Sequence, residues 1–236
     1  MSETQGYVNS SIENSIATIE FFHPASNSLP GAILNKLAET ITEVGNNDEA
    51  KVIILKSAGE KAFCAGASFD ELIAINDAAG GLQFFSGFAK VINAMRTCPK
   101  FIIGRIHGKA VGGGVGLAAS VDYAMATEYA SVKLSELAVG IGPFVVGPAV
   151  ERKMGLSAFS ILATDATEWR SAGWARDRGL YAEVWSSTGE MDEGIKVLAE
   201  KLAKSSPEAM AELKKVYWQG TEHWDTLLTE RAAISG

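Results

Sequence analysis

The chain has 236 residues, 47% of them hydrophobic and 21% charged, so it can bury a sizeable core in one large domain or two small ones. The formal net charge is −7 and no block of basic residues occurs. This disfavours nucleic-acid binding, because that function needs clustered lysine and arginine. No apolar run reaches the length of a membrane span, and residues 1–9 lack the layout of a signal peptide. We therefore expect a cytoplasmic protein that binds neither a membrane nor a nucleic acid.

The first two thirds of the chain predict alternating strands and helices. Residues 15–22 have strand composition, and residues 23–30 are typical of a turn. Apolar residues at three-to-four spacing predict a helix over 33–44 that stops at Gly45. Further on, the patterns predict strands at 51–56, 101–106, 121–127 and 132–134, a small-residue loop at 63–68, and helices from Asp70 to Pro99 and over 114–120.

From Pro148 onward strands become scarce. Helices are predicted at 149–154, 158–163, 171–178, 193–204 and 207–218. The organisation is thus an α/β core followed by a helical C-terminal part, without internal repeats. The two cysteines, Cys64 and Cys98, form neither a disulfide framework nor a metal-ligand pattern, so we expect two buried small side chains and no metal site.

A run of three glycines, Gly112 to Gly114, stands after an apolar segment and opens a helix of small residues. Bare backbone N–H groups at a helix start suit a phosphate or an oxyanion. A magnesium–phosphate loop is excluded: the interval from Gly104 to Lys109 is one residue short, and Ala110 stands where a serine or threonine should be.

Dinucleotide binding is a second interpretation of the same glycines. Gly114, Gly116 and Ala119 fit the loose Gly-x-Gly-x-x-Ala pattern, and Glu136 stands near the position expected for a ribose-binding acid. However, residues 107–111 are predicted to separate the preceding strand from the glycines, whereas the pattern needs a strand that runs directly into them. A Rossmann-type NAD-binding protein therefore stays an alternative with weak support.

A third interpretation joins two distant loops. Ala65-Gly66-Ala67 follows one predicted strand and the glycine run follows the next, so parallel strands would bring both loops to one sheet edge. Two backbone N–H groups that converge there form an oxyanion hole. A third loop, with Ser135 and Glu136, could add the carboxylate that enolate chemistry of a thioester needs as a base.

These segments together resemble the crotonase superfamily, the enoyl-CoA hydratase/isomerase family. The resemblance rests on residues 62–67, 106–114, 121–122 and 135–143, and it spans about residues 10 to 230 in order and spacing. It implies an α/β fold with a ββα spiral core over residues 1–190. It also implies a helical C-terminal region over 191–236 that builds a homotrimer or a hexamer.

The resemblance also implies roles for single residues. The N–H groups of Ala67 and Gly113 would hold the carbonyl of an acyl-CoA thioester, and Glu136 would be the acid/base. The loop of Ala65, Gly66, Ala67 and Ser68 would bind CoA, with Lys61 near a phosphate, and no cofactor beyond the CoA of the substrate is implied. Asp122, at the family's structural aspartate, is expected to serve in packing and hydrogen bonding.

One departure from the family shifts the expected reaction. The first glutamate of a typical hydratase falls at the position of Gly116 here. The resemblance implies that water addition in those hydratases uses both carboxylates, whereas one carboxylate can move a proton between two carbons of an allylic thioester, as the family's double-bond isomerases do. We therefore expect an enoyl-CoA isomerase, with hydration or another enolate reaction as the nearest alternative and a non-catalytic acyl-CoA-binding protein as an alternative of another class.

Two expectations concern the rest of the site. The apolar segment of residues 143–148 either lines an acyl pocket or packs at the start of the C-terminal helices. Because the sequence stops at Gly236, the C-terminal helix that helps to close the CoA site in this family is expected to be missing or trimmed.

Overall fold

The computed structural model describes residues 6–235. Residues 1–5, part of the stretch predicted to lack a signal peptide, and Gly236 lie outside it. Over the described range, no helix combines the length and the apolar character that crossing a membrane requires.

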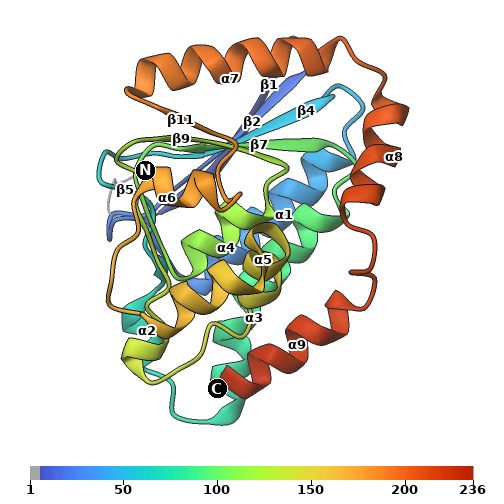
Figure 1. Cartoon of the computed structure of the whole chain (residues 1–236). Helices are drawn as coiled ribbons and strands as arrows, with labels where there is room; N and C mark the ends of the chain where they lie inside the picture. The colour runs from blue at the N-terminus through green and yellow to red at the C-terminus, as the bar shows by residue number, and fades with distance from the viewer. Residues whose placement is uncertain (1–5, 236) are drawn as a thin grey trace.

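A six-stranded sheet forms the centre of the molecule (Figure 1). Its strands, in spatial order, are β1 (Tyr7–Glu13), β2 (Ile16–Phe22), β4 (Val52–Ser57), β7 (Phe101–Ile106), β9 (Tyr123–Thr127) and β11 (Glu183–Trp185). Only the β1–β2 hairpin is antiparallel. The parallel strands β4 and β7 are almost fully buried, as expected for strands covered on both faces.

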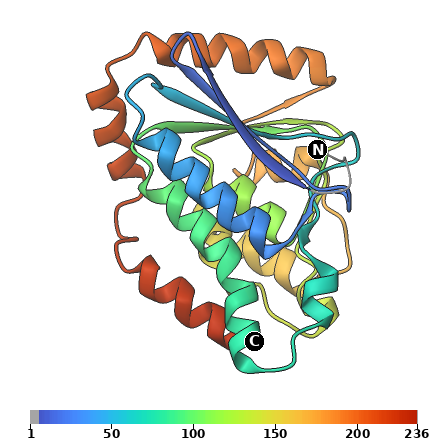
Figure 2. The ribbon, with the colours of Figure 1, turned by 180° about the vertical axis from the view of Figure 1, so that it is seen from behind.

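Helices cover both faces of this sheet. On one side lies α1 (Gly31–Gly45), with α3 (Ala78–Thr97) packed against it (Figure 2). On the other side lie α7 (Thr188–Ala203) and α8 (Pro207–Tyr217). A separate apolar cluster that includes Ile103, Met125 and Met191 joins α7 to the sheet. The C-terminal helices therefore begin as a layer of the core; their predicted role in a trimer stays a prediction.

Two small sheets carry the loops that the sequence singles out. One contains the parallel strands β10 (Val132–Lys133), β8 (Lys109–Val111) and β5 (Ala62–Cys64), and the other pairs β3 (Ser28–Leu29) with β6 (Gly66–Ala67). The prediction of a plain loop over 63–68 is therefore wrong. These strands are two or three residues long and form through pairing with neighbouring segments rather than through their own propensity.

The helix that follows the glycine run is α4 (Gly113–Ser120), and it is entirely buried. Strand β8 runs directly into Gly112, so the expectation that no strand meets the glycines is wrong. Nevertheless, β8 belongs to a small sheet, while the next strand, β9, belongs to the six-stranded sheet. The glycine run thus does not connect neighbouring strands of one sheet, as a dinucleotide-binding crossover does.

A side chain at any of the three glycines would either strain the backbone or clash with a neighbour. Gly112 adopts φ 53°, a left-handed conformation that a side chain disfavours. A Cβ at position 113 would lie 2.2 Å from Cζ of Phe88, and one at position 114 would lie 2.2 Å from the backbone oxygen of Cys64. Helix α4 therefore approaches α3 and β5 more closely than any side chain would allow.

We expect Gly114→Ala to destabilise the protein by about 2 kcal/mol. The new methyl would overlap backbone that cannot move aside, at a cost of about 1–3 kcal/mol that exceeds the helix-propensity gain of about 1 kcal/mol. Gly189→Ala in α7 is the matched control, because a Cβ there meets nothing within 4 Å. Urea denaturation of both variants measures the difference; equal stabilities would contradict the close approach of α4 and β5.

Asp122 takes part in a buried ion pair, which confirms its predicted structural role. Its Oδ2 lies 2.9 Å from Nζ of Lys214 in α8, and the two side chains are 5% and 2% exposed. The same oxygen accepts a hydrogen bond from the N–H of Ile102 at 2.7 Å, and Lys214 also donates to the backbone oxygen of Lys100. The pair thus anchors α8 to the entry of β7.

The last helix, α9 (Trp224–Ser235), packs against α3 (Figure 2). Trp224 meets Trp218 edge to face with ring centroids 5.8 Å apart, and Arg96 of α3 pairs with Asp225 at 2.9 Å. The sequence patterns do not predict this helix. It brings the end of the described chain back to the same cavity that the glycine run borders.

Candidate active site

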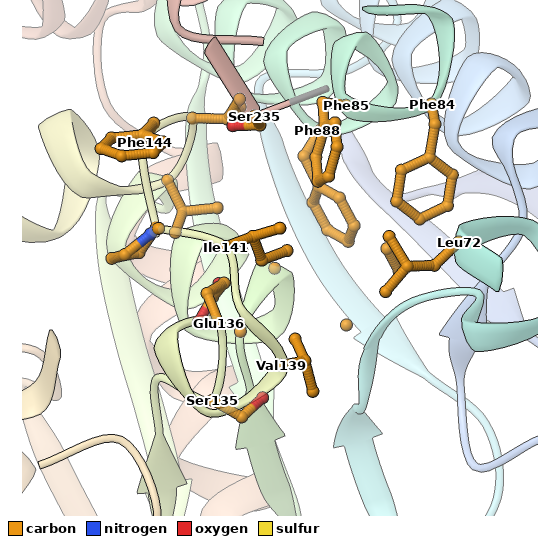
Figure 3. Close-up of a pocket in the computed structure, with 18 of the residues that line it drawn as sticks. Leu72, Phe84, Phe85, Phe88, Ser135, Glu136, Val139, Ile141, Phe144 and Ser235 are labelled. Atoms are coloured by element: carbon orange, nitrogen blue, oxygen red, sulfur yellow. The ribbon is translucent and has the colours of Figure 1, made fainter. Parts of the chain in front are cut away.

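One cavity of about 200 Å³ brings together the three loops that the sequence singles out (Figure 3). Its walls include Ala65, Gly66 and Ala67 from the β5–β6 segment, Gly112 and Gly113 from the glycine run, and Ser135 and Glu136 from the loop after β10. The remaining walls are mostly apolar. They come from α2 (Phe69–Ile73), α3 and the segment 139–146.

Gly113 is the first residue of α4, where helix geometry leaves the N–H group without an intrahelical acceptor and the helix dipole is positive. The β5–β6 loop lies close to it: a Cβ built on Gly66 would be 3.5 Å from the nitrogen of Gly113. Ala67 ends β6 on the same cavity wall. The structure therefore places both predicted donor residues beside one space.

Glu136 enters this space from a tight turn. Its backbone oxygen accepts hydrogen bonds from the N–H groups of Val139 and Ile141, which closes the chain around it. Its Oε1 would lie 3.1 Å from a Cβ built on Gly112, so the absence of a side chain there makes room for the carboxylate. Figure 3 shows the Glu136 side chain in the middle of the cavity, between the loop and the phenylalanines of α3.

The surroundings of Glu136 favour its neutral form. Burial raises the pKa of its carboxyl to about 7, because the loss of solvent disfavours the charged form more than the hydrogen bond from its own backbone favours it. Its Oε2 is buried and has no hydrogen-bond partner among residues 6–235. A carboxyl that titrates near neutral pH and has an unpaired oxygen can take up and return a proton.

A family model described as enoyl-CoA hydratase/isomerase matches residues 11–234, nearly the whole chain. The chain belongs to the enoyl-CoA hydratase/isomerase family. The carnitinyl-CoA dehydratase of Proteus mirabilis (strain HI4320) is 28% identical over 212 residues, which cover 86% of this chain and 77% of that protein. The peroxisomal Delta(3,5)-Delta(2,4)-dienoyl-CoA isomerase of Arabidopsis thaliana is 28% identical over 204 residues, 78% of this chain and 70% of that protein.

Solved structures of this family share the fold. An enoyl-CoA hydratase of Mycobacterium smegmatis superposes with a TM-score of 0.85 at 25% identity, covering 97% of this chain and 88% of that one. The mixed α/β fold of crotonase type predicted from the sequence is therefore confirmed.

In this member of the family, the space beside Gly116 is filled. A Cβ at position 116 would lie 2.6 Å from Cγ1 and 2.8 Å from Cβ of Val146. Val146 is 4% exposed and precedes α5 (Gly147–Thr164). The sequence lacks a second carboxylate at position 116, and the structure shows that the apolar side chain of Val146 occupies the place where such a side chain would begin.

The remaining predicted CoA-binding residues lie outside the cavity wall. Lys61 is exposed just before β5. Ser68 is buried and caps α2, since its hydroxyl accepts a hydrogen bond from the N–H of Glu71. Their roles toward CoA stay predictions. Cys64 and Cys98 are free and buried, as predicted, and burial raises the pKa of the Cys64 thiol to about 12.

Five phenylalanines line the cavity, and the sequence analysis singled out only the region of one of them, Phe144, as a possible site wall. Phe69 begins α2, Phe84, Phe85 and Phe88 come from α3, and Phe144 comes from the segment before α5. Phe85 and Phe88 lie on the apolar helix face that the spacing predicts, and such a face equally indicates core packing. Pro143 to Val146 line the same cavity, as the first of the two interpretations of residues 143–148 requires; that the cavity takes the acyl group stays a prediction.

Proposed function

We propose that this chain moves the double bond of an enoyl-CoA thioester through an enolate, with Glu136 as its single acid/base. The observation that carries the proposal is the charge of the cavity: Glu136 is the one ionisable side chain among its described lining residues. The CoA part of the substrate would lie along Ala65 to Ser68, with Lys61 near a phosphate.

The reaction needs one proton carrier and two hydrogen-bond donors. The carboxylate of Glu136 takes the proton from the carbon between the carbonyl and the double bond of a 3-enoyl thioester. The electrons of the broken C–H bond form an enolate, whose oxygen accepts hydrogen bonds from the N–H groups of Ala67 and Gly113. Glu136 then returns the proton to the far carbon of the former double bond, which leaves the 2-enoyl thioester and restores the carboxylate.

The pKa of Glu136 suits both halves of this cycle. A carboxyl with a pKa near 7 is a stronger base than an ordinary glutamate, and its protonated form is still acidic enough to give the proton back. A protein that only bound acyl-CoA would gain nothing from a carboxylate whose ionisation burial opposes. This supports an enzyme over a non-catalytic binding protein.

Water addition is the nearest alternative within the family, and the packing of Val146 disfavours it. Hydration through two carboxylates needs a second acid near the reacting carbons. The side of Gly116 that would supply it is occupied by Val146. The apolar wall of the cavity also offers few groups that could hold and orient a reacting water.

Incubation with 3-enoyl-CoA and 2-enoyl-CoA thioesters tests the proposal. We expect the 3-enoyl substrate to gain the absorbance of a conjugated thioester without a change in mass. We expect the 2-enoyl substrate to equilibrate with its isomer without a gain of water. Efficient formation of a hydrated product, or no reaction with either substrate, would contradict the proposed isomerase activity.

A further inference from the structure

A second, separate cavity adjoins the candidate active site, and the two cavities share one wall residue, Phe84. This second cavity measures about 520 Å³ and lies between α1, α3 and the segment 71–77. Its wall is mixed: apolar residues such as Ala32, Ala74 and Ile75 alternate with polar ones, which include Asn35, Glu71, Asn76, Asp77 and Lys90. Among the described residues, Phe84 is the only one that lines both cavities.

The three α3 phenylalanines are ordered along the cavity. The Phe88 ring stands against Gly113, one of the proposed oxyanion donors. Phe84 lies one helical turn before Phe88, about 5–6 Å along the helix axis. It meets Phe85 edge to face with ring centroids 4.9 Å apart, and Figure 3 shows it facing Leu72. A chain that starts at the thioester beside Gly113 and follows α3 thus reaches Phe84 after a few carbons.

The residues that line the cavity also determine whether the acyl chain can carry a charge. No lysine, arginine or histidine lines the cavity in the described part of the chain, so a carboxylate on the acyl group would find no counter-charge and would face Glu136. A cation on the acyl group would pair with Glu136 and lower the pKa that proton transfer needs. The hydroxyls of Ser28 and Ser235 already donate to backbone oxygens of Ala67 and Arg231.

We propose that the cavity takes a short, uncharged hydrocarbon acyl chain, and that Phe84 sets the length of this chain by separating it from the second cavity. The proposal rests on the proposed function in that it takes the thioester carbonyl to lie at Gly113. The size of the cavity supports it, because about 200 Å³ is below the roughly 300–1,000 Å³ of pockets that enclose a drug-sized ligand.

Binding of saturated straight-chain acyl-CoAs tests the proposal without any turnover. We expect the affinity of the wild-type protein to rise about fourfold for each methylene that enters the cavity. It should then fall at least tenfold once the chain extends beyond Phe84. An acyl-CoA of the optimal length that ends in a carboxylate should bind at least tenfold more weakly, as measured by calorimetric titration.

Phe84→Ala should join the two cavities and move the optimum to longer chains, with weaker binding of the short ones. Phe85→Ala is the matched control: Phe85 lines only the first cavity, so all lengths should weaken without a shift of the optimum. If Phe84→Ala does not fold, Phe84→Leu should give a smaller shift in the same direction. An unchanged optimum, equal binding of the carboxylate-ended chain, or no binding of any saturated acyl-CoA would overturn the proposal.

The two proposals fail in different ways. A clear length optimum without isomerisation of 3-enoyl-CoA would refute the reaction and leave the acyl chain assignment intact. Isomerisation with an optimum that Phe84→Ala does not move would overturn the proposal on chain length and leave the proposed reaction intact.

Discussion

Replacement of Glu136 by glutamine is expected to lower enoyl-CoA isomerisation at least about a hundredfold, because general acid–base catalysis by one side chain contributes roughly 10²–10⁴ in rate. The amide cannot accept the proton from carbon, and the structure offers no other ionisable group among the described lining residues of the cavity. Affinity for a saturated acyl-CoA should change by less than about threefold, since glutamine has nearly the same shape. The measurement is kcat/KM together with a binding titration.

The pH dependence of the wild-type enzyme should report the same carboxyl. Isomerisation begins with the ionised form, so kcat/KM should rise with pH and level off above about 7, the pKa to which burial raises Glu136. Glu128→Gln, at an exposed position away from the cavity, is the control and should keep both the rate and the profile. Activity that survives in Glu136→Gln would place the acid/base on another residue.

The stability of the fold should depend on pH in the opposite sense: kcat/KM rises with pH, whereas the free energy of unfolding should fall. In the native protein Glu136 keeps its proton up to about pH 7, whereas the unfolded chain releases it near the ordinary value of 4.5. Between these two values the native state binds more protons, so the free energy of unfolding falls as pH rises, by up to about 3 kcal/mol. Glu136→Gln removes this loss and should be more stable than the wild type at pH 8.

Loss of the buried cation at position 214 is expected to be the largest effect on stability. Lys214→Met leaves Asp122 buried with only the N–H of Ile102 as a partner for the same oxygen. Breaking such a pair typically costs about 3–5 kcal/mol. We expect about 3 kcal/mol, the lower end of this range, because Lys153 remains nearby and donates to the backbone oxygen of Asp122.

The neighbouring lysine provides the matched control. Lys215 pairs with Glu212 on the surface, where both side chains are more than 70% exposed, so Lys215→Met should cost less than about 1 kcal/mol. Combining Lys214→Met with Asp122→Asn removes both buried charges and should recover part of the loss. Similar denaturation midpoints for Lys214→Met and Lys215→Met would show that the buried pair does not stabilise α8 against the sheet.

Much of the fold can be predicted from the sequence, because a long segment with periodic or continuous apolar residues favours one type of secondary structure. The spacing over 33–44 predicts α1, and the apolar run over 51–56 predicts β4, each within two residues. Strand β1 is missed because it lies at the sheet edge with a polar sequence. Its hairpin turns at Asn14 and Ser15, which adopt the left-handed conformation without the glycine that usually marks such a turn.

Other errors come from contacts that no local pattern contains. The predicted helix from Asp70 is interrupted between Ile73 and Ala78, where Asp77 caps the N-terminus of α3 with its side chain. Helix α9 carries its buried residues, Trp224, Leu228 and Ala232, at intervals of four, a faint signal within a polar segment. The two helices predicted at 149–154 and 158–163 form one element, α5, that bends at Gly155.

For the site, the sequence indicates the polar groups and the structure adds the space around them. The order of motifs is enough to expect Ala67, Gly113 and Glu136 together, and the structure places all three on one cavity. The sequence also shows that a glycine, Gly116, stands at the position where a typical hydratase of the family has its first glutamate. Only the three-dimensional packing shows that Val146 occupies this place and that Phe84 divides two cavities, because these contacts join residues that are far apart in the chain.

The strand order of the large sheet has a consequence for synthesis. From β1 to β11, each strand joins the edge left by its predecessor, so a chain that leaves the ribosome from its N-terminus never has to insert a strand between two others. The cavity forms later than the sheet. Because Ser235 at the end of α9 belongs to its wall, the sheet can assemble before α9 has been synthesised, but the cavity is complete only once α9 has packed.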